Sequence, residues 1–296
     1  MATSVRGMPE SGTAAPADAR LSWTQMLWFG ALLITCYAPI LYRLGINWAN
    51  DEDMGHGFFV PLVAGYIIWQ RREALAAEKP EPSYWGLLLI VWGAVQMMLG
   101  TLGAELFLAR TSFLISLVGA IWFLLGTRIL RMLAFPLSLL LFMIPIPAIV
   151  YSRITLPLQI FASRVAENIL GVIGIPVLRD GNVLELASQK LSVAEACSGI
   201  RSLLSLSFLS LIYAYFFDRK VWMRWALLAT TIPIAIAANA TRVSVTGILS
   251  EVRADLAQGF FHMLEGWVLF LIALALLLLA HKLINVFYYK FHGNTI

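Results

Sequence analysis

Long apolar stretches separated by short polar loops run through most of the chain. This pattern predicts membrane-crossing helices at about 21–44, 57–70, 85–102, 104–126, 129–149, 198–217, 222–248 and 262–285. A helix needs about 20 apolar residues to cross a hydrocarbon core of about 30 Å, and the stretch at 57–70 is shorter than that. We therefore predict an all-α integral membrane protein with about eight transmembrane helices.

The segment between the fifth and sixth predicted helices has a different pattern. Within residues 152–170, Gln159, Ser163 and Glu167 recur every four positions, which predicts an external amphipathic helix lying on the outer membrane surface. The run VLRDGNVLEL then predicts two short strands around an Asp-Gly turn, and KLSVAEA predicts a third. We expect this small β-hairpin or three-stranded cap to lead directly into the sixth helix.

Composition supports the membrane assignment. Of the 296 residues, 60% are hydrophobic and 13% are charged, and the mean hydropathy is +0.80, which excludes an ordinary water-soluble domain. The net charge of +4 fits basic cytoplasmic loops, so the expected partner is the lipid bilayer and no nucleic acid. Residues 1–20 are small and polar and predict a disordered cytoplasmic tail, followed by one polytopic domain over 21–296.

The basic residues predict the orientation, because cytoplasmic loops of membrane proteins are enriched in Lys and Arg. If the N-terminal tail is inside, every inside segment carries at least two basic residues. These are Arg6, Arg20, Arg71, Arg72, Lys79, Arg128, Arg131, Arg219, Lys220, Arg224, Lys282 and Lys290. Both termini are therefore predicted in the cytoplasm, and the segment 151–197 outside.

Polar clusters at the outer helix ends are candidates for function, because ionisable residues near the membrane are costly. In AEACSGIRS, Cys197 stands at the start of the sixth helix, where the positive end of the helix dipole favours a thiolate. Glu195 precedes it, and Arg201 follows one turn later on the same face. The alternative interpretation is a buried structural cysteine.

Two further clusters would complete the chemistry of a thiol. Asn239 and Arg242 are three residues apart and share a face of the seventh helix, although an arginine near a helix end can also extend to lipid headgroups. His262 and Glu265 are neighbours at the start of the eighth helix, so the carboxylate could orient the imidazole. A histidine placed there could act as the general base that thiol chemistry requires.

The fourth cluster, DEDMGHGFFVP, combines three carboxylates with His56. Clustered carboxylates with a single histidine are typical of a solvated loop, so we predict no metal site and interpret His56 as lining the site. His281 and His292 fall on the cytoplasmic side and are interpreted as solvated residues at the helix end.

Together these motifs resemble the exosortase/archaeosortase family. The similarity rests on EACSGIRS, on Asn-x-x-Arg at Asn239 and Arg242, on His-x-x-x-Gly-Trp from His262 to Trp267, and on HGFFVP, in the family's order. It extends over about residues 22–285. Gly55 departs from the pattern, since a serine is expected before the His-Gly pair.

The resemblance implies a membrane-embedded cysteine protease or transpeptidase in the bacterial inner membrane, with its site facing the periplasm and no cofactor. Its partners would be exported, membrane-anchored proteins with a C-terminal sorting signal, made of a Pro-Glu-Pro-like motif, a transmembrane helix and a basic tail. By motif match, Cys197 would be the nucleophile, with Arg242 and His262 completing the catalytic set. Arg201, Asn239, Glu195, Glu265 and His56 would support it.

Two other functions remain open at this level. A polytopic transporter would place its charges near mid-bilayer, often on broken helices, whereas these cluster at one face. A non-catalytic scaffold of an exopolysaccharide or export system would tolerate loss of Cys197.

Overall fold

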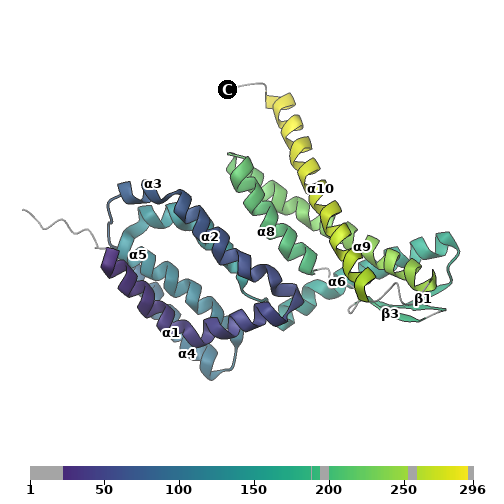
Figure 1. Ribbon diagram of the computed structural model, residues 1–296, viewed down its shortest axis with the longest axis horizontal. Coiled ribbons are helices and arrows are strands. Elements are labelled where there is room, and N and C mark those ends of the chain that lie inside the picture. Colours follow the sequence, from purple (N-terminus) through teal and green to yellow (C-terminus); the bar gives the residue numbers. More distant parts are fainter. Residues whose placement is uncertain (1–22, 188, 194–199, 253–258, 293–296) are drawn as a thin grey trace, which may run out of the picture. The chain divides into compact units, whose positions relative to one another are not determined.

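The computed structural model describes residues 23–187, 189–193, 200–252 and 259–292. The chain divides into two compact units, Met1–Arg43 with Val63–Ser138, and Leu44–Leu62 with Leu139–Ile296. Within the described residues, six helices are long and apolar enough to cross a membrane. The chain is therefore a multi-pass membrane protein, largely helical (Figure 1).

The regular elements described in the first unit are all helices. Its elements are α1 (Trp23–Asn50), α2 (Phe59–Gln70), α3 (Arg72–Ala77), α4 (Trp85–Leu102) and α5 (Leu106–Leu139). The last turns of α1 and the first turn of α2 belong to the second unit. Gly86, Gly93 and Gly100 lie seven residues apart on α4 and allow the backbone of α5 to approach closely. A Cβ at Gly86 would lie 2.2 Å from the Phe123 nitrogen. Small residues are typical of helix contacts within lipid. No hydrophobic force drives helices together there, so close packing of their backbones stabilises the contact.

The predicted count of eight spans is not confirmed. The stretches predicted at 104–126 and 129–149 fall largely in α5 and the short helix η2 (Leu140–Met143), with a break at Gly126. Gly126 has φ +84°, and a Cβ there would lie 2.0 Å from the Glu81 carbonyl oxygen, so only glycine fits this break. The stretch predicted at 57–70 forms a helix of 12 residues, which is shorter than a full span requires. The stretch predicted at 198–217 is described as a helix of 18 residues, Ile200–Phe217, and is not among the six counted spans.

The second unit carries the candidate site. It contains η1 (Glu52–Phe58), α6 (Ala148–Ile173), α8 (Ile200–Phe217), α9 (Val221–Val252) and α10 (Gly259–His292). Helices α8 and α10 both pack along α9 (Figure 1). Their shared core contains Leu206 of α8, Met223 and Leu227 of α9, and Leu277 of α10, all almost completely buried.

The predicted three-stranded cap is present between α6 and α8. Strands β1 (Val177–Asp180), β2 (Val183–Leu186) and β3 (Lys190–Ser192) form an antiparallel sheet in the order β1-β2-β3. Gly181 turns the first hairpin with φ +61°. Leu184, Leu191 and other inward side chains pack on small residues of α6 and on Ala240 and Val243 of α9. The sheet is therefore fixed to the helix that carries Arg242.

Helix α6 has the predicted amphipathic pattern, but its polar face is covered. A helix lying on a membrane surface would turn Gln159 and Ser163 to water, whereas both are buried. Asn182 donates a hydrogen bond to Gln159 (3.0 Å), and Ser163 donates one to the Gly181 carbonyl (3.0 Å). The outward residues include apolar side chains such as Phe161. The length and composition of α6 also fit a membrane span, so its place on the outer surface stays a prediction.

A hydrogen-bonded cluster of Tyr213, Asp218, His281 and Asn285 lies where α8 ends and α9 begins. It shows that the interpretation of His281 as a solvated residue is wrong. This side chain is only 12% exposed. Its Nε2 lies 3.1 Å from Asp218 Oδ2, and its Nδ1 lies 3.0 Å from the Tyr213 hydroxyl. Burial raises the pKa of Asp218, but hydrogen bonds from the Lys220 backbone, His281 and Asn285 outweigh it, so this pKa lies below its ordinary value. His281 thus links α10 to the loop between α8 and α9.

Candidate functional site

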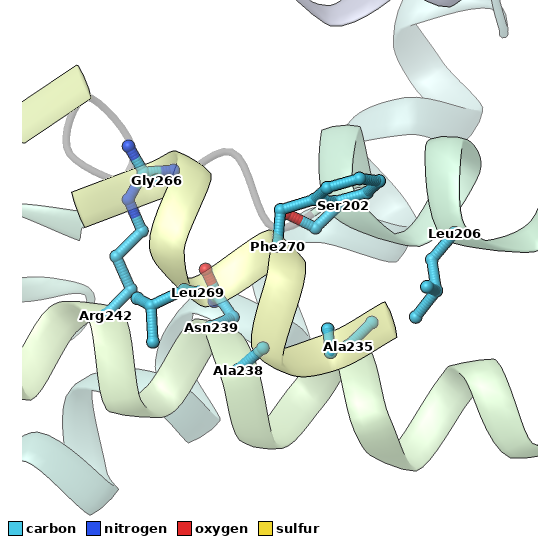
Figure 2. Close-up of a pocket in the computed structure, with 10 residues that line it drawn as sticks. Ser202, Leu206, Ala235, Ala238, Asn239, Arg242, Gly266, Leu269 and Phe270 are labelled. Atoms are coloured by element: carbon cyan, nitrogen blue, oxygen red, sulfur yellow. The ribbon is translucent and has the colours of Figure 1, made fainter. Parts of the chain in front are cut away.

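A small pocket opens among α8, α9 and α10 at the end of the bundle opposite His281. It is lined by Ser202, Leu206, Ala235, Ala238, Asn239, Arg242, Gly266, Leu269, Phe270 and Ala273. Apolar and small residues form most of the wall, and the polar groups come from Ser202, Asn239 and Arg242 (Figure 2). One cationic fork and two hydrogen-bonding groups in an apolar surrounding make a site that can hold a negatively charged or strongly polar oxygen.

Arg242 is placed by its contact with α10. Its side chain extends from α9 toward Gly266 (Figure 2), where a Cβ would lie 3.3 Å from the guanidinium Nη2. The absence of a side chain at Gly266 therefore lets the guanidinium rest against the second turn of α10. Asn239, one turn before Arg242, is 8% exposed and lines the same pocket.

The carboxylate of Asp53 connects three elements near the start of α8. Its Oδ1 accepts a hydrogen bond from Arg201 Nε at 2.7 Å, which makes an ion pair. Its Oδ2 accepts one from the Tyr151 hydroxyl at 2.9 Å. Asp53 belongs to η1, Tyr151 to α6 and Arg201 to α8, so one side chain joins the early acidic block to the helix that follows the AEACSG motif.

His56 lies close to this connection, but it is not among the residues that line the pocket, and its partners are backbone and aromatic groups. Its Nε2 lies 3.1 Å from the Phe142 carbonyl oxygen, and its ring lies 6.3 Å from the Phe208 ring of α8, centroid to centroid. Burial lowers the pKa of His56 below its ordinary value, although the Phe142 and Asp53 carbonyls and the Asp53 charge oppose this shift. Burial therefore favours the neutral form of the imidazole.

Four predicted site residues lie wholly or partly outside the described structure. Glu195 and Cys197 are outside the described residues. His262 and Glu265 lie in the first two turns of α10, and only their backbone is described. Gly266 follows His262 by four residues, so the helical repeat places the two one above the other on α10.

A family model described as transmembrane exosortase matches residues 48–279. The chain belongs to the transmembrane exosortase family. No curated protein and no solved structure matches it. The resemblance drawn from the sequence motifs is confirmed, and the match covers the early His-Gly block as well as the three later blocks of this exosortase.

Sequence reasoning missed several residues that the structure brings into this region. Asp53 was assigned to a solvated loop, whereas its side chain is 20% exposed and ion-paired. Tyr151 carried no motif and could not be found from its position. Gly266 stands inside the His-x-x-x-Gly-Trp block. A glycine at this position is a signal in the sequence that another group packs closely against the helix. Arg201, predicted to support the thiol, is bonded to Asp53.

We expect Asp53→Asn to lower the stability of the detergent-solubilised protein by about 1–2 kcal/mol, because Arg201 would lose its charged partner. The pair is partly exposed, so solvent limits the loss. The matched control is Asp51→Asn, since Asp51 is exposed and its capping oxygen survives the change. Thermal unfolding measures both variants. Equal unfolding temperatures for Asp53→Asn and Asp51→Asn would contradict the role given to this ion pair.

A second expectation concerns pH. Because the folded pKa of His56 is lowered, the unfolded chain binds a proton near the ordinary value of 6.5, whereas the folded chain binds it only at lower pH. The stability that neutral His56 contributes is present above this value and is lost as the pH falls below it. His56→Gln keeps a donor for the Phe142 carbonyl but does not titrate. From about pH 7.5 to about pH 5.5, the unfolding temperature of the parent protein should therefore fall further than that of the variant.

Proposed function

We propose that this exosortase is a membrane-embedded cysteine protease or transpeptidase that acts on exported proteins with a C-terminal sorting signal. The observation that carries the proposal is the convergence of the motif blocks. Ser202 of the first block, Asn239 and Arg242 of the second, and Gly266 of the third line one pocket, although they are far apart in sequence. Cys197, five residues before Ser202, and His262, one turn before Gly266, belong to the same two blocks.

The proposed chemistry is acyl transfer through a thioester. His262 takes the thiol proton, and the Cys197 sulfur attacks the carbonyl carbon of the scissile peptide bond. The oxygen becomes an oxyanion, which the Arg242 guanidinium stabilises. When the C–N bond breaks, His262 returns the proton to the leaving amine. Water, or an external amine or hydroxyl, then attacks the thioester and releases Cys197.

Arg242 is suited to the oxyanion role because it is half-buried and held by its neighbours. A guanidinium in a partly desolvated pocket interacts more strongly with a developing charge than one in water. Asn239 adds a buried amide one turn away on the same side of α9. Glu265, by its spacing from His262, would orient the imidazole, and Arg201 would favour the thiolate.

The proposed orientation places the pocket at the periplasmic face of the inner membrane and both termini in the cytoplasm. It is supported by the two ends of the α8–α9–α10 bundle. Helix α8 rises about 23 Å from Ser202 to its end at Phe217, which approaches the thickness of a hydrocarbon core. Lys220 and Arg224 stand at the end away from the pocket, as expected for a cytoplasmic loop.

The direct test uses a reporter protein with a Pro-Glu-Pro-type motif, a transmembrane helix and a basic tail at its C-terminus. We expect cells with the parent protein to shorten the reporter, and cells with Cys197→Ala to accumulate the uncut form with equal amounts of inserted enzyme. Cys36→Ala is the matched control, since Cys36 is exposed on α1 and has no role in this chemistry. Equal processing by Cys197→Ala and the parent protein would remove the enzyme proposal.

The role of Arg242 can be separated from simple attraction to headgroups. If its planar fork binds the oxyanion, Arg242→Lys should insert normally yet cut the reporter about two to three orders of magnitude more slowly. Gly266→Ala should give a smaller loss, because the new Cβ would press against the guanidinium. Initial cleavage rates measure both. Near-normal cleavage by Arg242→Lys would favour the alternative, in which Arg242 only contacts lipid headgroups. Arg201 would then be the better candidate for binding the oxyanion.

A further inference from the structure

The three-stranded sheet has an edge with unused hydrogen-bonding groups at β3. The backbone N–H of Leu186 donates to the Gln189 carbonyl (2.9 Å), and that of Val193 donates to the Asn182 carbonyl (3.0 Å). Residues 189, 191 and 193 therefore face β2. Because backbone groups alternate along a strand, those of Lys190 and Ser192 point away from the sheet. Among the described residues, none forms a backbone hydrogen bond with these outward groups.

This edge must lie outside the hydrocarbon core, because an open strand edge in lipid would leave its polar groups unsatisfied. The side chain of Lys190 is 73% exposed and pairs with Glu185 on the outer face of the sheet. Ser192 is half-buried. The edge is thus accessible from water or from the membrane interface, and an unpaired edge is a template for another extended chain.

The edge is also rigidly placed beside the candidate site. Leu191 of β3 and Leu184 of β2 are buried in a cluster that includes Ala240 and Val243 of α9. Ala240 and Val243 are close to Arg242 in sequence. The sheet therefore packs on the same helix, α9, that holds the Arg242 side chain. In sequence, Ser192 precedes Cys197 by five residues, which an extended chain spans in at most about 18 Å.

We propose that the outward edge of β3 binds the extended peptide segment of a substrate just before its transmembrane helix, by adding it as a fourth strand. This inference rests on the proposed function. Strand addition takes its affinity from main-chain hydrogen bonds, so it tolerates variation in the bound sequence. It also holds the peptide straight, which keeps the scissile bond in one orientation as it enters the site beside Arg242.

Capture of the uncut reporter tests the proposal. The enzyme carries Lys190→Cys as its only cysteine, because Cys36→Ala and Cys197→Ala remove the two native ones. The reporter carries a single cysteine, placed in turn at successive positions before its transmembrane helix. Side chains alternate between the two faces of a strand, so disulfide-linked pairs should form at every second position. A cysteine at Leu178, which is exposed on the opposite strand β1, should capture none of them.

The hydrogen bond itself is tested by proline. Ser192→Pro removes an outward N–H and leaves the bonds to β2 intact, and proline is tolerated on an edge strand. It should reduce capture about five- to tenfold. Val177→Pro removes the equivalent outward N–H of β1 and should keep capture.

Four outcomes decide between the claims. Capture without alternation, or capture unaffected by Ser192→Pro, overturns the strand-addition inference. Disulfide-linked dimers of the Lys190→Cys protein in place of reporter capture would assign the edge to a second copy of the chain and also overturn it. Cleavage of the reporter by the parent protein without alternating capture leaves the proposed function standing alone. Alternating capture without cleavage supports the edge and overturns the proposed function.

Discussion

The carboxylate of Asp53 accepts hydrogen bonds from Arg201 and Tyr151 with its two oxygens, and the arrangement around the pocket depends on it. These bonds tie η1, α6 and the start of α8 together across about 150 residues of sequence. A carboxylate this poorly exposed is costly unless it is paired, and here it has both a cation and a hydroxyl. The pairing links the first turn of α8, and with it Ser202, to η1 and α6. Helix α6 in turn packs on α9, which supplies both Asn239 and Arg242.

The second unit has a group of polar residues at each end of the α8–α9–α10 bundle. At one end, Asp218, His281, Tyr213 and Asn285 satisfy one another, so the loop between α8 and α9 is bound to α10. At the other end, the pocket combines Asn239, Arg242 and Ser202 with apolar walls. Buried polar groups that satisfy one another rigidify a fold, whereas polar groups that face a cavity can act on a ligand. We therefore propose the pocket, and not the cluster around His281, as the place of the reaction.

Hydrophobic periodicity predicted the helical membrane class, the three-stranded cap and most helix positions, because these depend on local pattern. It could not predict that α6 turns Gln159 and Ser163 inward, since a covered polar face and a wet one have the same spacing in the sequence. The pattern also separated the stretches 104–126 and 129–149 at the point where α5 breaks at Gly126. It could not predict the close approach of the Glu81 carbonyl oxygen, which leaves room only for glycine there, because that contact is tertiary.

The candidate site divides in the same way. Asn239 and Arg242 were found because a three-residue spacing on a helix places them on one face, and the motifs identified the family. Asp53 and Tyr151 were missed because their importance comes from a long-range contact with Arg201 and with each other, which no spacing encodes. His281 was misassigned for the same reason, since its buried partners come from a different helix and loop.

The central claim is that Cys197 forms a covalent bond to the substrate's carbonyl carbon. The most direct measurement is mass spectrometry of the enzyme isolated from cells that express the sorting-signal reporter, after rapid quenching in acid, which preserves thioesters. We expect a peptide containing Cys197 that carries the new C-terminal residue of the reporter and releases it with hydroxylamine. Processed reporter together with an unmodified Cys197, or an adduct on any other residue, would contradict it.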